Sequence, residues 1–206
     1  MDDPVFRLLT HSALASIIGS VVIVSILAWI FPPAHRALIL VPYRVARYFE
    51  VHRLLTAGWL HANVGHLVLN MFSLYVFAEW ALKPLGPGRF LALYVSAVVV
   101  AFIPTTLRRQ GDPRYSSLGA SGAVAAVMLS AILLDPRHYL RLYFLPIFAI
   151  PAPIYAFGYI AYSMVQSVRS SDGVNHSAHL SGAVYGAALT WVFEPAKVER
   201  TIRMFF

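Results

Sequence analysis

The chain has 206 residues, of which 59% are hydrophobic and 12% charged, and its mean hydropathy is +0.67. This composition excludes an ordinary soluble domain, which is about half apolar and about a quarter charged, and favours a membrane protein. The formal net charge of +7 does not favour nucleic-acid binding, because the basic residues stand singly or in pairs between apolar runs, as at the ends of membrane helices. The absence of cysteine excludes a disulfide, a thiolate metal site and a cysteine nucleophile.

Apolar windows bounded by proline, glycine and charged residues predict six membrane-spanning helices. They lie near 12–31, 64–82, 89–106, 119–135, 144–165 and 178–194. The first window follows Asp2 and Asp3 instead of a basic start, and it is longer than the apolar region of a signal peptide, so we expect a retained helix. Segment 32–63 is too polar to span and too apolar for a plain linker. We expect an amphipathic piece there that lies in the membrane interface.

The orientation of the chain is predicted from lysine and arginine in its loops. The 16 basic residues divide eight against eight between the two sides. Discounting the four in segment 32–63 leaves eight against four and places both termini in the cytoplasm. We therefore expect an all-α, multi-pass membrane protein, in the cytoplasmic (inner) membrane of a prokaryote. The oligomeric state does not follow from the sequence.

Three of the predicted spans bring polar side chains to one depth. Spans 64–82, 119–135 and 178–194 run in the same direction, so their starts share one face of the membrane. Near those starts lie His66 and Asn70, then Ser121, and then His179. Polar groups in hydrocarbon cost free energy unless they are paired or face a wet cavity, so this cluster predicts a functional site.

Ser121 and His179 have the residue types of a nucleophile and its general base. A serine is activated when a base lies within hydrogen-bonding distance, which here requires the two helices to approach closely. After His179 come Gly182 and Gly186, which are four residues apart. Small residues at this spacing allow a neighbouring helix backbone to approach closely. No Asp or Glu lies at either helix start, so the prediction is a dyad without a carboxylate.

Acyl transfer also needs donors for the developing oxyanion. The backbone N–H groups of Ala120 and Ser121 begin a helix and lack partners within it. His66 and Asn70 are four residues apart and so share a face, and both side chains can donate. Two glycines let backbone and substrate come close to the serine, namely Gly119 and Gly122.

Other interpretations of these residues remain open at this point. Small residues around a serine in a membrane helix also serve packing alone, and His66 with Asn70 also suits an interhelical hydrogen-bonded pair. His61 with His66, or His176 with His179, has the residue type of a zinc site. Because the chain has no HExxH motif, no cysteine and no carboxylate near them, we expect no metal.

The chain resembles the rhomboid intramembrane serine proteases over nearly its whole length. The resemblance rests on the following stretches: Arg53-Leu54-Leu55-Thr56, His61-Ala62-Asn63-Val64-Gly65-His66-Leu67-Val68-Leu69-Asn70-Met71, Leu85-Gly86-Pro87-Gly88-Arg89-Phe90, Gly119-Ala120-Ser121-Gly122, Ile150-Pro151-Ala152-Pro153 and Asn175-His176-Ser177-Ala178-His179-Leu180-Ser181-Gly182. It implies one rhomboid membrane domain over 1–206, built as a six-helix bundle with an interfacial loop between the first two helices. It also implies a serine endopeptidase without a cofactor.

The resemblance assigns roles to the predicted site residues. Ser121 would attack the scissile carbonyl, and His179 would act first as base and then as acid. His66, Asn70 and the amides of Ala120 and Ser121 would form the oxyanion hole. Substrates would be transmembrane segments of other proteins in the lipid bilayer, admitted past span 144–165 and loop 166–177. The alternative is a non-catalytic rhomboid-like protein that binds client transmembrane helices.

Some features depart from the family pattern, and one of them concerns the support of His179. Many relatives place a tyrosine one turn after the nucleophile, stacked on the catalytic histidine, whereas this chain has Ala125. Tyr94 or another ring would have to take that role. Prolines 146, 151 and 153 are expected to loosen or bend the start of span 144–165.

Overall fold

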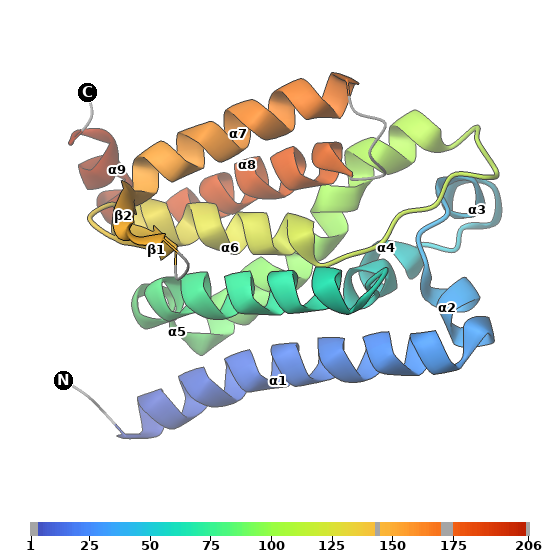
Figure 1. The fold of residues 1–206 in the computed structure, drawn as a ribbon, viewed down its shortest axis with the longest axis horizontal. Coiled ribbons are helices and arrows are strands. Elements are labelled where there is room, and N and C mark those ends of the chain that lie inside the picture. The colour runs from blue at the N-terminus through green and yellow to red at the C-terminus, as the bar shows by residue number, and fades with distance from the viewer. Residues whose placement is uncertain (1–3, 143–144, 170–174, 205–206) are drawn as a thin grey trace.

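A computed structural model describes residues 4–142, 145–169 and 175–204 of the chain. Most of these residues are helical (Figure 1). The helices are α1 (Pro4–Ile30), α2 (Pro32–Leu38), α3 (Pro42–Tyr48), α4 (Arg53–Thr56), the 3₁₀ turn η1 (Ala57–Trp59), α5 (Val64–Arg109), α6 (Ser121–Leu134), α7 (Ala152–Arg169), α8 (His176–Phe193) and α9 (Pro195–Ile202). The strands β1 (Tyr139–Leu142) and β2 (Leu145–Pro151) form an antiparallel hairpin.

The long helix α5 combines two of the predicted spans. It is interrupted at Gly86, where φ is 74° and ψ is 163°. A positive φ of this size is readily adopted by glycine, and Pro84 and Pro87 on either side each remove a backbone donor. The chain reverses at this point, so that 64–85 and 87–109 run as two helices (Figure 1). They correspond to the predicted spans 64–82 and 89–106.

The helices that carry the predicted site are neighbours in the bundle. α6 packs against both α5 and α8, and the starts of these three helices lie at one end of the molecule together with α2, α3 and α4 (Figure 1). The two ends of the chain and the β-hairpin lie at the opposite end. The predicted common direction of spans 64–82, 119–135 and 178–194 is therefore confirmed.

Burial distinguishes the central helix from the outer ones. Every residue of α6 from Gly122 to Ile132 is buried, so this helix contacts protein on all sides. Large apolar side chains are instead exposed on the outer helices, among them Ile23 of α1 and Phe157 of α7. Within the described residues, Leu8–Ile30 and Val64–Arg109 are the two helices that are both long and apolar enough to cross a membrane.

At the hairpin, two predictions need correction: the start of the helix at 144–165 and the all-α fold class. The predicted helix at 144–165 begins only at Ala152, because 145–151 forms β2 and pairs with β1 through Leu140↔Ile150 and Arg141↔Ala149. Pro146 and Pro151 lack backbone donors and disfavour a helix at this point. The chain is thus mainly but not wholly helical. Residues 143 and 144 lie outside the described part.

The segment expected to be amphipathic and interfacial folds as several short helices. α2 and α3 each begin with a proline, whose fixed φ suits the first turn, and α4 continues into η1. The sequence analysis did not anticipate α9, a short helix after the last span that buries Val198 and Thr201 against the bundle.

Candidate active site

Ser121 and His179 meet at the starts of two neighbouring helices. Ser121 is the first residue of α6, and His179 is the fourth residue of α8. His179 Nε2 lies 2.6 Å from Ser121 Oγ, and both side chains are half-buried. This is the hydrogen-bonded contact that a serine and its base require, and it joins residues 58 positions apart.

The close approach of α6 and α8 depends on glycine. A Cβ on Gly182 would collide with the backbone of Gly122, and one on Gly186 would collide with the backbone of Ala126. A Cβ on Gly122 would lie 2.5 Å from the Cβ of Ala101 and 3.1 Å from a backbone oxygen of α8. The two helix backbones are therefore in direct contact at these positions, which lets a side chain as short as serine reach the imidazole.

Gly119 sets the path of the chain into α6. Its φ is +119°, in the region that favours glycine, and its N–H donates to the carbonyl of Ala57 at 2.9 Å. A Cβ on Gly119 would lie 2.9 Å from Cε1 and 3.1 Å from Nε2 of His66. The absence of a side chain at this position thus allows the His66 ring to lie against the loop that carries Ser121.

A single hydrogen bond indicates the tautomer of His66. The backbone N–H of Ala62 lies 3.5 Å from His66 Nδ1, which makes Nδ1 the acceptor and leaves the proton on Nε2, next to Gly119. His61 packs edge-on against this ring at 4.9 Å between centroids. His61 is itself held by Ser25, whose Oγ lies 3.0 Å from His61 Nδ1 and donates to the carbonyl of Trp59. The two histidines thus have different surroundings: His61 is buried, and His66 lies beside Gly119.

A cavity of about 160 Å³ opens beside the serine–histidine pair. Its lining residues come from α5, α6, α7 and α8: Leu69, Asn70, Ser73, Phe77, Ser121, Val124, Ala125, Met128, Tyr155, Tyr159 and His179. The Asn70 amide donates to the His66 carbonyl at 2.9 Å, which leaves its second N–H for another acceptor. Ser73, one turn further along α5, is a polar lining residue that the sequence analysis did not identify.

A ring from α7 stacks on His179. The Tyr159 and His179 ring centroids are 6.2 Å apart with an interplanar angle of 23°. Ala125, at the position where many relatives have tyrosine, lines the same cavity without a ring. Tyr94 does not supply the ring: it is fully buried and packs edge-on against Trp59, 6.2 Å between centroids.

The ring contacts continue from Tyr159 toward the hairpin end of the molecule. Tyr159 stacks with Tyr155 at 6.5 Å, and Tyr155 stacks with Phe77 of α5 at 6.3 Å. Phe77 contacts Trp80, which lies almost parallel to His138 at 4.2 Å. Along the cavity, α7 therefore meets α5 and α8 through stacked aromatic rings.

Asn175 fixes the start of the helix that carries His179. As the N-cap of α8 it accepts from the Ala178 N–H at 3.1 Å. It also accepts from the hydroxyl of Thr105 at 2.8 Å and donates to that of Ser117 at 3.0 Å. The sequence analysis gave Asn175 no role, although an asparagine directly before an apolar periodic run is a known N-cap signal.

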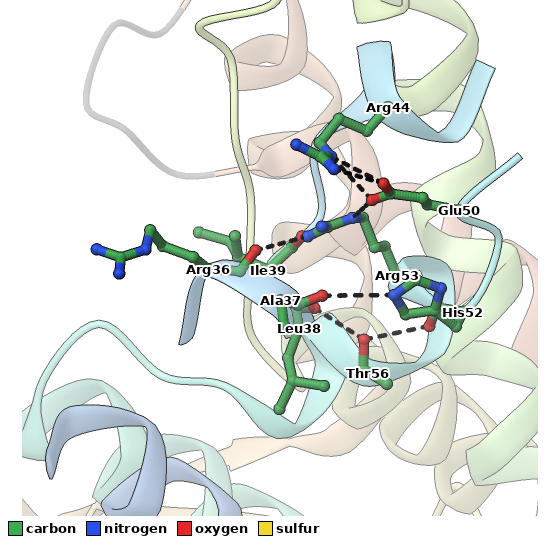
Figure 2. A network of polar contacts seen from close by, with 9 residues as sticks. All are labelled: Arg36, Ala37, Leu38, Ile39, Arg44, Glu50, His52, Arg53 and Thr56. Atoms are coloured by element: carbon green, nitrogen blue, oxygen red, sulfur yellow. Dashed lines mark hydrogen bonds and ion pairs between the residues drawn. The ribbon is translucent and has the colours of Figure 1, made fainter. Parts of the chain in front are cut away.

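The segment 32–63 supports the serine loop from outside. Leu40 and Ser117 exchange two backbone hydrogen bonds, of 3.0 and 3.1 Å. The buried guanidinium of Arg53 donates to the carbonyls of Arg36 and Ile39 and pairs with Glu50 (Figure 2). The contacts of Arg53 fix the conformation of segment 32–63. Through Leu40 and Ser117, this segment in turn fixes the chain just before Ser121.

The predicted access loop at 166–177 is only partly described. Helix α7 extends to Arg169 and α8 begins at His176, with Asn175 as its cap. Residues 170–174 lie outside the described part of the chain.

A helical bundle with long apolar helices and large apolar side chains on its outer face has the features of a membrane protein, and this one has a serine–histidine contact beside a cavity. A family model described as "Rhomboid domain" matches residues 48–196. The chain therefore belongs to the rhomboid family.

Curated relatives support the same assignment. RHOMBOID-like protein 12, mitochondrial, of Arabidopsis thaliana is 34% identical over 158 residues, which cover 69% of this chain and 46% of that protein. The Presenilin-associated rhomboid-like protein, mitochondrial, of Rattus norvegicus is 29% identical over 77% of this chain and 42% of its own length. Rhomboid-like protein 11, chloroplastic, of Arabidopsis thaliana is 31% identical over 74% of this chain and 57% of its own. The chain thus spans about half the length of these relatives.

Proposed function

We propose that this rhomboid protein is an intramembrane serine endopeptidase that cleaves transmembrane segments of other membrane proteins. The observation that carries the proposal is the 2.6 Å contact between Ser121 Oγ and His179 Nε2 beside a cavity between four helices. A structural serine has no need of an imidazole partner at a cavity wall, whereas a nucleophile needs both the base and the space for a substrate.

In the proposed reaction, Ser121 Oγ attacks the scissile carbonyl carbon while its proton moves to His179 Nε2. The same proton then passes to the leaving amine as the peptide bond breaks, which leaves an acyl-enzyme on Ser121. A water molecule, deprotonated by His179, hydrolyses this ester and returns Ser121 to its starting state. Every proton transfer uses side chains of this chain, so the proposal includes no cofactor.

The oxyanion would be held at the start of α6. The amides of Ala120 and Ser121 lie at the positive end of the helix dipole, and the Nε2–H of His66 lies beside Gly119. The unused N–H of Asn70 completes the set. Removing one donor of this kind typically slows the chemical step about 10²–10³-fold.

The same proposal includes the membrane topology. Six crossings would be formed by α1, the two halves of α5, α6, α7 and α8. At 14 residues, α6 is about 21 Å long, shorter than a hydrocarbon core, and its complete burial among the other helices keeps it away from lipid. Substrate would enter past α7, whose rings close the cavity. The curated relatives are named for mitochondria and a chloroplast, so they give no support to a prokaryotic inner membrane.

The test is labelling of the purified protein with a fluorophosphonate serine probe, followed by cleavage of a model transmembrane substrate in detergent. Ser121→Ala should abolish both, and His179→Ala should reduce both by orders of magnitude. Ser130→Ala, a buried serine further along the same helix, is the matched control and should leave labelling intact. Labelling or cleavage that survives Ser121→Ala would show that Ser121 is not the nucleophile. A folded wild-type protein that neither labels nor cleaves would favour a non-catalytic protein that binds client helices.

A further inference from the structure

A second hollow lies at the α2–α3 end of the molecule, apart from the serine–histidine cavity. It encloses about 530 Å³ and is lined by α2, α3 and the segment that precedes α6. Its polar lining residues are His35, Arg36, Tyr43, Arg44, Tyr48 and Ser116. No carboxylate is among the described residues that line it, so its walls present only donors, cations and hydroxyls.

The charges around this hollow do not cancel. Glu50 accepts three hydrogen bonds from Arg44, of 2.6, 2.9 and 3.0 Å, and one from Arg53 (Figure 2). The Arg44 and Arg53 guanidinium groups thus share one carboxylate, and with Arg36 the residues drawn in Figure 2 have a formal surplus of two positive charges. Figure 2 shows the side chain of Arg36 extending away from Glu50, with only its backbone carbonyl in the network. A negatively charged ligand would therefore meet an uncompensated cation.

The walls of the hollow are held in place before any ligand binds. Arg53 donates to the carbonyls of Arg36 and Ile39 at 2.9 and 2.6 Å, and Thr56 donates to that of Leu38 at 2.8 Å. The Leu40–Ser117 backbone pair fixes the opposite wall. Because the backbone is already ordered, binding would cost little conformational entropy.

Exposed apolar side chains stand next to these cations. Tyr48 is 59% exposed, Phe49 82% and Val51 60%, and Phe49 has a φ of 58°, an uncommon conformation for a residue other than glycine. A free phosphate ion has no apolar part that could contact these side chains, whereas a phospholipid has acyl chains close to its phosphate.

We propose that this hollow binds the phosphate of an anionic phospholipid, with the guanidinium groups of Arg36 and Arg44 on the phosphate oxygens and the side chains of Tyr48 and Phe49 beside the acyl chains. Guanidinium groups match phosphate oxygens in geometry and charge. The site does not depend on the proposed peptidase activity. Occupancy would hold the segment 32–63, and through Ser117 the serine loop, at the membrane surface.

The test is native mass spectrometry of the detergent-solubilised chain titrated with dioctanoylphosphatidylglycerol, with dioctanoylphosphatidylcholine and inorganic phosphate as separate titrations. We expect saturable binding of the phosphatidylglycerol, about fivefold to tenfold tighter than the phosphatidylcholine, since each arginine near an anionic headgroup contributes on this scale. The preference should weaken as salt is raised. Equal affinity for the two lipids would overturn the proposal, as would inorganic phosphate displacing phosphatidylglycerol at similar concentrations.

Matched variants locate the site. Arg36→Gln should remove most of the preference for phosphatidylglycerol over phosphatidylcholine, and Arg36→Lys should retain part of that preference. Arg47→Gln is the control, because Arg47 is an exposed arginine of α3 that does not line the hollow, and it should leave the preference unchanged. The Arg36 side chain makes none of the network contacts in Figure 2, and circular dichroism checks that its variants fold. An unchanged preference in folded Arg36→Gln, or an equal loss in Arg47→Gln, would place lipid selectivity elsewhere.

Discussion

The ring of Tyr159 lies nearly parallel to that of His179, 6.2 Å between centroids, although the two residues belong to different helices. The helix of Ser121 lines the same cavity with Val124, Ala125 and Met128, none of which carries an aromatic ring. The orientation of the proposed base therefore depends on α7, the helix past which a substrate is proposed to enter. Movement of α7 would alter both the entrance and the support of the imidazole.

Replacing Tyr159 tests this dependence. Tyr159→Leu should lower kcat about tenfold with a smaller effect on KM, because it removes ring stacking on the base and leaves most of the cavity wall. Tyr159→Phe should restore most of the rate. The pH dependence of fluorophosphonate labelling should also move in Tyr159→Leu, since the stacked ring is part of the environment of the base.

The control for that change is Phe157→Leu. Phe157 is 76% exposed on α7, two residues from Tyr159, and it does not line the cavity. The Phe157→Leu variant should therefore leave kcat and the pH dependence of labelling unchanged. An equal loss in both variants would mean that the substitutions act by loosening α7 as a whole.

Close packing of α6 on α8 is tested by adding single methyl groups. Gly182→Ala should destabilise the fold by about 1–3 kcal/mol, because the new Cβ collides with the Gly122 backbone, and it should also reduce labelling of Ser121. Gly158→Ala is the matched control, since nothing lies within 4 Å of its added Cβ. That variant should keep its stability or gain up to about 1 kcal/mol from helix propensity. Thermal unfolding in detergent measures both.

The parts of this architecture that were predictable from sequence are those set by local pattern. Apolar windows predict most of the helices, and the common direction of alternate spans predicts that Ser121 and His179 lie at the same end of the bundle. The spacing of Gly182 and Gly186 predicted how close the two helices are. These inferences succeed because a lipid environment leaves the backbone few alternatives to a spanning helix.

What the sequence did not show depends on contacts between distant elements. The strands β1 (Tyr139–Leu142) and β2 (Leu145–Pro151) pair with each other, and β2 takes the place of the start of a predicted helix. Prolines in an apolar stretch indicate that a helix is disfavoured there, but they do not indicate which structure forms instead. Tyr159 is one of several aromatic residues on α7, and only the rotation of that helix brings it onto His179. Asn175 carried a recognisable N-cap signal, but its links to Thr105 and Ser117 depend on the fold.

Asn175 is therefore a position where stability and activity should fall together. Asn175→Ala removes the N-cap of α8 and leaves Thr105 and Ser117 without their partner, so we expect a loss of about 2–3 kcal/mol and slower labelling of Ser121. Asn175→Asp keeps an acceptor for the Ala178 N–H and for Thr105, and should recover most of the loss. If Asn175→Asp behaves like Asn175→Ala, the link to Ser117 is the dominant contribution.

Acid should weaken the segment 32–63 through Glu50. Hydrogen bonds from Arg44, and then from Arg53, lower the pKa of the Glu50 carboxyl from its ordinary value of 4.5 to about 2. A carboxyl with a depressed folded-state pKa contributes stability that is fully present above the unfolded value and is lost as the pH falls toward the folded value. The thermal midpoint of wild-type protein should therefore exceed that of Glu50→Gln at pH 7, and the two should converge between about pH 4.5 and pH 2. Glu199→Gln on α9, outside this network, controls for the loss of one negative charge from a basic chain. A difference between wild type and Glu50→Gln that stays constant down to pH 2.5 would show that the carboxylate is not held by these arginines.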